Sequence, residues 1–413
     1  MKKVMRLLVI TSAVHYRHQG ALWAYGPYVR EIEMWADLFS IVRLAAPCLH
    51  ESPPGDCLPI RRANVTISPK LQVGGHGLLR KIPYLWNVAI LSWQLIGDLT
   101  WSDAVHVRNP GNLGLLGAVL TPVFSRRMVS KYAGQWVAYP GEPLTVRLQR
   151  KILASRWWRG PVTVYGKWPG QPRHVVPFFS SAMSEAQLER ARKASSPKLF
   201  ETPLRVLFVG RLSQPKNVDL LIRAVAQINS TAPRLKCSIV GVGPELPRLE
   251  QLVERLNVRN EVEFTGGLDH ELVLEQLERA HLLVLVSESE GWPKALVEAM
   301  AFGLICIGSN RGLVPQLLGN NRGFVVPVGD TEALISVLSR IVADPQSYAS
   351  MSQAAAAWAQ GFSLERLRDE LRSLLERSWG CLLPGASNAS AESPVEKNVG
   401  RAFDLPVRHG RPS

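Results

Sequence analysis

The chain has 413 residues, of which 46% are hydrophobic and 20% charged, a composition that excludes a fully disordered chain or a fibrous repeat. Its 48 Lys and Arg exceed its 34 Asp and Glu, and the whole excess lies in residues 1–200, which carry 26 basic and 10 acidic side chains. We therefore expect the first half to face an anionic partner, with a merely solvated basic surface as the alternative. No zinc-finger spacing or RNA-binding aromatic signature is present in the sequence, so an acidic membrane surface is favoured over nucleic acid.

Residues 4–11 predict a buried first strand. Two lysines precede this apolar run, as in a signal peptide, but Arg6 interrupts it and leaves it too short. The further elements expected in the first half are a polar, glycine-containing loop at 15–26, a helix at 28–38, and strands at 103–107 and 128–131.

The apolar stretch 82–99 is the longest in the chain's first half. It contains Pro83, Asn87, Gln94 and Asp98, whereas a membrane-spanning helix needs about 20 mostly apolar residues. The stretch therefore predicts an amphipathic or buried helix, and no transmembrane anchor is expected.

The second half alternates regularly between apolar runs and amphipathic segments. Near-continuous Val, Ile and Leu runs flanked by such segments are typical of a parallel sheet covered on both faces. We predict strands at 204–210, 235–241, 261–264, 282–287 and 304–308, helices at 218–227, 245–256, 271–280 and 293–302, and a final strand and helix across 323–341.

These patterns predict an α/β fold of two doubly wound, Rossmann-like domains with a ligand between them. Residues 193–203 contain Ser-Pro and Thr-Pro turns and are interpreted as the linker. The expected boundaries are 1–195, 196–382 and a flexible tail at 383–413, where Pro, Gly, Ser, Ala and Glu accumulate without periodicity.

In open α/β sheets ligands bind beyond the carboxyl ends of the strands, so the loops that follow the strands are the candidate ligand-binding segments. The segment Gly210-Arg211-Leu212-Ser213-Gln214-Pro215-Lys216-Asn217 places two cations after a strand and before a helix, an arrangement that suits a diphosphate. A solvated Lys216 is the alternative. The loop Gly241-Val242-Gly243-Pro244 would let a phosphate or sugar approach the backbone, but it lacks the third glycine of the dinucleotide fingerprint.

A third loop carries two acids, Glu290 and Glu298, on either side of Gly291 and of the helix entry at Pro293. Carboxylates accept paired hydrogen bonds from vicinal hydroxyl groups, so the two acids next to a cationic loop suit a polyhydroxyl ligand that bears phosphates. The alternatives are an acid that favours the helix dipole and an exposed helical position.

The run Ser-Glu-Ser-Glu-Gly-Trp-Pro-Lys-Ala-Leu-Val-Glu-Ala-Met, with Glu290 and Glu298 eight residues apart, resembles the donor-site motif of glycosyltransferase family 4. Its members are retaining, nucleotide-sugar-dependent transferases of the GT-B fold, in which two Rossmann-like domains face each other across a cleft. The two glycine loops stand in the family's order and spacing. The resemblance is strong over 205–330 and only architectural over 1–195.

The resemblance implies a role for each of these residues. Glu298 would hold the ribose hydroxyls of a UDP or GDP sugar and Glu290 those of the transferred sugar, while Arg211 and Lys216 would neutralise the departing diphosphate. No divalent metal or other cofactor is implied, and the sequence contains no Asp-x-Asp. The remaining donor-binding candidates are Gly210, Gly243, Gly291, Trp292, Pro293 and Lys294.

The first domain departs from the family pattern. Asp103-Ala-Val-His106 matches the family's Asp-x-x-His, after which a second histidine often approaches the donor sugar, but Arg108 stands in the place of that second histidine. His106, Arg108 and Gly20 are therefore candidate residues of the cleft, with turn and surface roles as the alternatives.

The resemblance also implies that the basic first domain carries the acceptor, a glycan or a polyprenyl-diphosphate-linked saccharide of cell-surface or exported polysaccharide synthesis. Five scattered cysteines without Cys-x-x-Cys spacing favour a reduced, cytoplasmic protein. We expect peripheral attachment to the inner face of the cell membrane through basic clusters at 61–62, 80–81, 126–127 and 147–159, the last with Trp157 and Trp158.

Two alternatives of other classes remain open. A GT-B epimerase would release an altered sugar without any acceptor, and a non-catalytic protein would only bind the nucleotide sugar. A phosphorylase would need a lysine that holds pyridoxal phosphate and a much longer chain.

Overall fold

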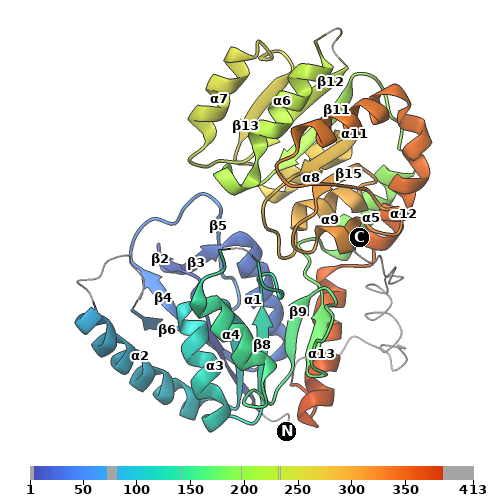
Figure 1. The fold of residues 1–413 in the computed structure, drawn as a ribbon. Helices are drawn as coiled ribbons and strands as arrows, with labels where there is room; N and C mark the ends of the chain where they lie inside the picture. The colour runs from blue at the N-terminus through green and yellow to red at the C-terminus, as the bar shows by residue number, and fades with distance from the viewer. Residues whose placement is uncertain are drawn as a thin grey trace. The chain divides into compact units, whose positions relative to one another are not determined.

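The computed structural model describes residues 4–71, 81–139, 141–196, 198–230, 232 and 234–384. The chain forms two compact units (Figure 1). Of the described residues, unit 1 holds those up to Ala182 and those from Leu364 onward, and unit 2 holds Met183–Ser363.

Unit 1 is built on a sheet of ten strands among its described residues, in the order β10-β9-β8-β7-β1-β4-β2-β3-β5, with β6 paired to β4. Strand β1 lies between β4 and β7 in parallel register, and its residues from Leu7 to Ile10 are fully buried, as expected for a first strand. The strands are β1 (Arg6–Ile10), β2 (His15–His18), β3 (Ala21–Tyr25), β4 (Ile41–Leu49), β5 (Cys57–Pro59), β6 (Val65–Lys70), β7 (Ala104–Asn109), β8 (Met128–Tyr132), β9 (Val162–Tyr165) and β10 (Val175–Phe178).

Helices cover both faces of this sheet. The crossovers from β6 to β7, β8 and β9 run in one direction and place α2 (Lys81–Trp101), α3 (Asn112–Phe124) and α4 (Leu144–Ala154) on the same face, whereas the crossover toward β4 places α1 (Gly26–Leu38) on the other (Figure 1). Helix α2 confirms the helix expected at 82–99. None of the described helices has an apolar run long enough to cross a bilayer.

The polar loop predicted at 15–26 is instead a β-hairpin of β2 and β3, joined by Gln19 and Gly20. Both turn residues have positive φ, 49° and 77°, as a two-residue hairpin turn of the favoured twist requires. Gly20 is therefore a turn residue. The aromatic residues Tyr16, Trp23 and Tyr25, on either side of the Gln19-Gly20 dipeptide, were the signal that could have predicted the hairpin.

Unit 2 contains a six-stranded parallel sheet in the order β13-β12-β11-β14-β15-β16 among its described residues. This is the strand order of a dinucleotide-binding sheet, in which the first strand and the fourth are neighbours. The strands are β11 (Leu204–Val209), β12 (Leu235–Val240), β13 (Val262–Gly266), β14 (Leu282–Leu285), β15 (Ile305–Ser309) and β16 (Phe324–Val326).

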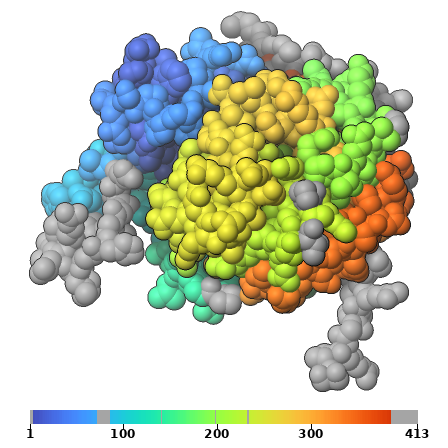
Figure 2. Space-filling model, turned by 90° about the horizontal axis from the view of Figure 1, so that it is seen from above, coloured from blue at the N-terminus to red at the C-terminus, as the bar shows by residue number. Residues whose placement is uncertain are grey.

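The predicted helices of unit 2 are present, and α5, α10 and α12 are additions. Helix α7 shows why these helices could be predicted from their amphipathic pattern. Leu249, Leu252 and Val253 are buried, while the other face of the helix, in yellow in Figure 2, lies on the surface. The helices are α5 (Glu185–Ser195), α6 (Val218–Ile228), α7 (Leu246–Arg255), α8 (His270–Arg279), α9 (Lys294–Ala301), α10 (Val314–Leu318), α11 (Thr331–Ala343) and α12 (Ala349–Ala359).

The chain enters and leaves unit 2 at places that differ from the predicted boundaries of 195 and 382. Helix α5 starts with a capping box, in which the Ser184 hydroxyl accepts from the Gln187 N–H and the Gln187 side chain accepts from the Ser184 N–H. Gln360, directly after α12, donates to the Ser195 hydroxyl at 3.0 Å, so α5 packs within unit 2 and belongs to it.

The last described helix, α13 (Leu364–Trp379), returns to unit 1. The indole N–H of Trp379 donates to the Met128 carbonyl of β8 at 3.3 Å, and its ring lies 6.2 Å from that of Phe39. These residues were predicted to belong to the second domain, 196–382, because chain order alone does not reveal such a return. The predicted tail at 383–413 lies, from residue 385 onward, outside the described residues.

Candidate active site

The strand order of unit 2 defines where a ligand is expected. Strands β11 and β14 are neighbours, and the chain proceeds from them toward opposite edges of the sheet. Ligands of open α/β sheets bind beyond the carboxyl ends of the strands at this switch point. The two loops that follow these strands, 210–217 and 286–293, are the loops that the sequence analysis singled out, and each leads into a helix N-terminus.

The two loops are bound to each other through the backbone. The Glu288 N–H donates to the Pro215 carbonyl at 2.8 Å, and the Asn217 side chain donates to the Val286 carbonyl at 3.1 Å. Asn217 adopts a left-handed conformation (φ 51°), which turns the chain from the short 3-10 helix Gln214–Lys216 into α6. This connection fixes the position of the cationic loop relative to the acidic one.

Lys216 and Glu290 meet across these loops. The Lys216 Nζ lies 2.5 Å from Glu290 Oε1, and both side chains are largely buried, with 25% and 11% of their area exposed. The structure therefore brings together a cation and an acid that were predicted to share one site. A diphosphate that approached Lys216 would compete with Glu290 for the ammonium group.

Glu298 lies on α9 and is buried, which excludes the exposed helical position considered as the alternative. Its Oε1 is 3.2 Å from Nε2 of His270, the first residue of α8. Sequence reasoning missed His270, because the only signal was its place directly after the loop that follows β13. An imidazole bound to one carboxylate oxygen orients the carboxylate and leaves the other oxygen for a different partner.

The glycine loops pack closely against one another. A Cβ atom on Gly243 would lie 2.1 Å from the Leu212 carbonyl oxygen, and one on Gly241 would lie 1.9 Å from that of Gly210. The Leu212 N–H donates to the Val242 carbonyl at 3.0 Å. Contact between two backbones therefore requires these glycines, whether or not a ligand also approaches Gly243.

The other donor-site candidates surround the same loops. The Arg211 side chain is exposed beside Gly210, and Trp292 is buried, with its ring 5.8 Å from that of Phe362. Pro293 caps α9 rather than forming its first residue. Gly291 and Lys294 lie on either side of these two residues, at the entry to the helix.

The candidates in unit 1 are placed differently from the expectation that they line a cleft. His106 lies on the central strand β7 and is fully buried, with its ring stacked on Trp35 at 4.2 Å between centroids. Neither ring nitrogen has a hydrogen-bond partner among the described residues. Burial lowers the pKa of His106 to about 3, so it is a neutral core residue at physiological pH.

Arg108 is bound inside unit 1. Its guanidinium donates to Glu31 Oε1 at 2.8 Å, and Lys131 Nζ lies 2.9 Å from the other carboxylate oxygen. Burial alone would raise the pKa of Glu31, but the charges of Arg108 and Lys131 hold it well below its usual range. Glu31 and Lys131 are separated from Arg108 by many residues in the sequence, so no local pattern could predict this triad.

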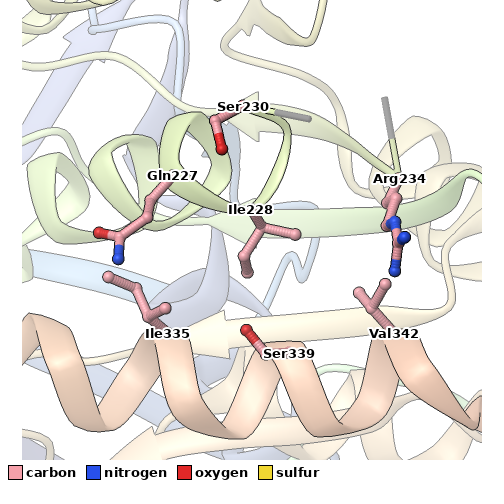
Figure 3. Close-up of a pocket in the computed structure, with 7 residues that line it drawn as sticks. All are labelled: Gln227, Ile228, Ser230, Arg234, Ile335, Ser339 and Val342. Carbon is pink, nitrogen blue, oxygen red and sulfur yellow. The ribbon is translucent and has the colours of Figure 1, made fainter. Parts of the chain in front are cut away.

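A hollow of about 310 Å³ lies elsewhere in unit 2, between the carboxyl-terminal end of α6 and the side of α11 (Figure 3). Helix α6 starts at the carboxyl edge of the sheet and runs away from it, so its last residues lie at the opposite edge. The hollow is therefore separate from the switch point, and it is lined by Gln227, Ile228, Ser230, Arg234, Ile335, Ser339 and Val342.

Comparison with known proteins bears on unit 2 first. Residues 189–358 match the family model described as glycosyl transferases group 1. The matched segment begins in α5 and ends in α12, and it contains every donor-site candidate named above.

Curated relatives extend the match over different lengths. N-acetyl-alpha-D-glucosaminyl L-malate synthase of Bacillus anthracis is 31% identical over 158 residues, 38% of this chain and 41% of that protein. The amylovoran biosynthesis glycosyltransferase AmsK of Erwinia amylovora is 30% identical over 146 residues, 34% of this chain and 36% of that protein. A GDP-mannose-dependent alpha-(1-6)-phosphatidylinositol monomannoside mannosyltransferase of Mycolicibacterium smegmatis is 26% identical, over 60% of this chain and 69% of that protein. The chain thus spans less than half the length of the two more similar relatives.

Solved structures match almost the whole chain in fold. HepE of Anabaena, in complex with UDP and glucose, has a TM-score of 0.65 at 16% identity and covers 91% of this chain and 100% of its own. Sucrose-phosphate synthase of Thermosynechococcus elongatus has a TM-score of 0.64 at 21% identity, with coverages of 91% and 99%. The predicted fold class, α/β of the GT-B type with two doubly wound units, is confirmed.

Proposed function

We propose, from the match of residues 189–358 to glycosyl transferases group 1, that this protein is a retaining glycosyltransferase of family 4. It moves a sugar from a nucleotide diphosphate sugar to a hydroxyl group of a glycan or of a lipid-linked saccharide. The observation that carries the proposal is the meeting of Lys216 and Glu290 at the switch point of unit 2, with the buried Glu298 on the adjoining helix.

Each group has a role in this reaction. Lys216 and Arg211 neutralise the diphosphate as the bond from the sugar's anomeric carbon to the phosphate oxygen breaks. Glu290 binds hydroxyl groups of the transferred sugar, and the backbone at the start of α9 contacts the same sugar. The acceptor oxygen bonds to the anomeric carbon on the face that the phosphate leaves, and its proton passes to the departing phosphate oxygen.

Glu298 binds the ribose diol in this proposal, and His270 holds it in place. The contact of 3.2 Å between His270 Nε2 and Glu298 Oε1 leaves Oε2 for the ribose hydroxyls. His270 is thus a positioning residue, since it acts on the nucleotide through Glu298.

We further propose that the transfer needs no divalent metal. The sequence contains no Asp-x-Asp, and two fixed cations are available for the developing charge. Preorganised groups of this kind are worth about 10²–10³ in rate each. An assay in EDTA tests this point, and loss of turnover that Mg²⁺ or Mn²⁺ restores would contradict it.

The donor and acceptor classes are also proposals. UDP and GDP remain the candidate nucleotides: HepE was solved with UDP, and the mannosyltransferase relative is named as dependent on GDP-mannose. That relative is also named for a phosphatidylinositol monomannoside, and AmsK for amylovoran biosynthesis, which supports a lipid-linked or polysaccharide acceptor.

A donor screen tests the function. Release of nucleotide diphosphate is measured for UDP and GDP sugars with and without a cell-envelope lipid extract, and isothermal titration measures UDP and GDP binding. Acceptor-dependent release supports a transferase. Release of an altered sugar without acceptor would indicate an epimerase, and binding without release a non-catalytic nucleotide-sugar-binding protein.

A further inference from the structure

Helices α2, α3 and α4 lie side by side over one face of the sheet of unit 1 (Figure 1). Their inner faces are part of the core, where Leu91, Leu95 and Leu99 of α2 and Leu153 of α4 pack with the strands. Such helices usually present charged or polar residues on the opposite face. In this chain the outer faces of α2 and α3 carry exposed apolar side chains as well.

The outer face of α2 carries two tryptophans. Trp86 and Trp93 are seven residues apart, so they lie on one side of the helix, and 71% and 78% of their surface is exposed. The only charged residue from Trp86 to the end of the helix is Asp98, which is buried and bound by Lys70 at 2.8 Å. Exposed tryptophans on an uncharged helix face are unusual for a surface that contacts only water.

Helix α3 continues this surface without a single charged residue. Val119, Val123 and Phe124 are exposed on it. The indole N–H of the exposed Trp157 donates to the Val119 carbonyl at 3.2 Å, which joins the segment after α4 to the same surface.

Helix α4 adds cations to the apolar surface. Leu144 and Leu148 are exposed, and so are Arg147 and Lys151 in the turns between and after them. Between Asp103 and Glu185 the sequence has eleven Lys and Arg and one acid, Glu142, which is paired with Arg150. Among the described residues, no ion pair involves any of Arg126, Arg147, Lys151, Arg156 and Arg159.

We propose that this surface, the α2–α4 face, docks on a lipid bilayer that contains anionic lipid. Tryptophans and aliphatic side chains enter the interfacial layer, and the unpaired cations contact the lipid phosphates. The charge complementarity favours a bilayer over a second copy of this chain, because two copies would bring like charges together. The inference deepens the proposed function, since a lipid-linked acceptor would be met at this surface, but lipid binding is measured without donor or acceptor.

Flotation with vesicles tests the proposal. Wild-type protein is expected to float with phosphatidylcholine–phosphatidylglycerol vesicles and to bind much less to phosphatidylcholine alone. Trp86→Gln with Trp93→Gln should lower the binding to the anionic vesicles about tenfold or more. Arg147→Gln with Lys151→Gln should lower it roughly 25-fold, at about fivefold for each cation, and should reduce its dependence on salt.

Matched variants in unit 2 serve as controls. Leu199→Gln replaces an exposed apolar residue and Arg223→Gln an exposed cation of α6, and neither should change flotation. All the substituted side chains are exposed, so thermal midpoints are expected to stay within a few degrees of the wild type. If the tryptophan pair fails to fold, the pair on α4 carries the test.

Unchanged flotation of both double variants, or a wild-type protein that binds neither vesicle, would overturn the proposal. Sedimentation velocity without lipid tests the alternative that a second copy of the chain covers the α2–α4 face. A wild-type dimer that becomes a monomer in the Trp86→Gln, Trp93→Gln variant would support that alternative and contradict the proposal. These outcomes are independent of the donor screen. A failed lipid-binding test leaves the glycosyltransferase proposal standing, and a failed donor screen leaves the lipid-binding proposal standing.

Discussion

At the scale of single residues, Lys216 carries the clearest prediction. Its ammonium group is held 2.5 Å from Glu290, at the point where a diphosphate is proposed to depart. Lys216→Ala removes a fixed cation from the transition state and should lower kcat at least about a hundredfold. Steady-state release of nucleotide diphosphate measures the effect.

The matched control for Lys216 is Arg223→Ala, which removes an exposed cation from the outer part of α6 in the same unit. Its kcat should equal that of the wild type. Near-wild-type turnover of Lys216→Ala would remove Lys216 from the mechanism and leave the departing charge to Arg211.

His270 is predicted to act only through Glu298. His270→Ala should weaken the binding of the ribonucleoside diphosphate about tenfold, as expected when a hydrogen bond to a carboxylate is lost. A 2′,3′-dideoxy analogue lacks the hydroxyls that Glu298 would bind, so its affinity should be nearly the same for wild type and variant.

Isothermal titration with both nucleotides gives the comparison for His270. A merely structural role would weaken both nucleotides equally, and that result would contradict the positioning role. His270→Gln, which retains a donor, should recover part of the discrimination between the two.

His106 and His15 predict how unit 1 responds to acid. Burial lowers the pKa of His106 to about 3 and that of His15 to about 4, below the ordinary value of about 6.5. The unfolded chain therefore binds more protons below pH 6.5, and each imidazole lowers the free energy of unfolding by about 1.4 kcal/mol per pH unit there. His106→Phe should keep the stack on Trp35 and remove one contribution.

Urea unfolding at pH 7 and pH 5 checks the histidine prediction. The wild type should lose stability on going to pH 5, and His106→Phe should lose about half as much. An unchanged loss in the variant would show that the acid sensitivity has another origin.

At the scale of elements, the loops of unit 2 were predictable because their chemistry is local. The strand ends, the helix entry at Pro293 and the acids Glu290 and Glu298 lie within short segments whose periodicity is regular. The contacts between loops were not predictable. That Gly243 faces the Leu212 carbonyl, or that His270 reaches Glu298, depends on the spacing of neighbouring strands, which one sequence does not display.

Gly243 supplies the prediction at this scale. An alanine there would place its Cβ 2.1 Å from the Leu212 carbonyl oxygen, so the two loops must separate, at a cost of about 1–3 kcal/mol. Gly243→Ala should lower the thermal midpoint and weaken nucleotide binding. Differential scanning calorimetry and isothermal titration measure the two effects.

Gly267→Ala is the control for Gly243, because its Cβ would meet only Val242, at an ordinary contact distance of 3.7 Å. It should be tolerated. Equal behaviour of the two alanines would contradict the view that Gly243 is needed for the contact between the loops.

Two elements show where pattern reading failed for a physical reason. The hairpin of β2 and β3 was predicted as a loop because its strands are short and polar residues and Gly20 stand between them. His106 was predicted at a cleft on a likeness to a family motif. The ring is instead buried against Trp35, a contact across 71 positions of sequence that no local pattern encodes.

At the scale of the whole molecule, the number of units and their fold class were predictable, and their boundaries were not. Alternating strands and helices give the class, whereas the assignment of α5 and α13 depends on which core each helix joins. Both helices are amphipathic, so either core would have satisfied them on composition alone.

The return of α13 to unit 1 predicts that its core residues stabilise that unit. Leu375 is fully buried, and Leu375→Ala should cost about 2–5 kcal/mol. Hydrogen exchange should show faster amide exchange in unit 1 and little change in unit 2. Leu382→Ala, at a position that is 83% exposed, is the control, and faster exchange confined to unit 2 would contradict the assignment.

The course of the chain has a practical consequence for engineering. The polypeptide leaves unit 1 after Ala182 and rejoins it at Leu364, so unit 2 is inserted into unit 1. Chimeras that exchange unit 2 therefore need two splice points, one after Ala182 and one before Leu364. A chimera made with a single splice point would leave unit 1 without its own α13. Its stability would fall even if every substituted residue suited the new substrate.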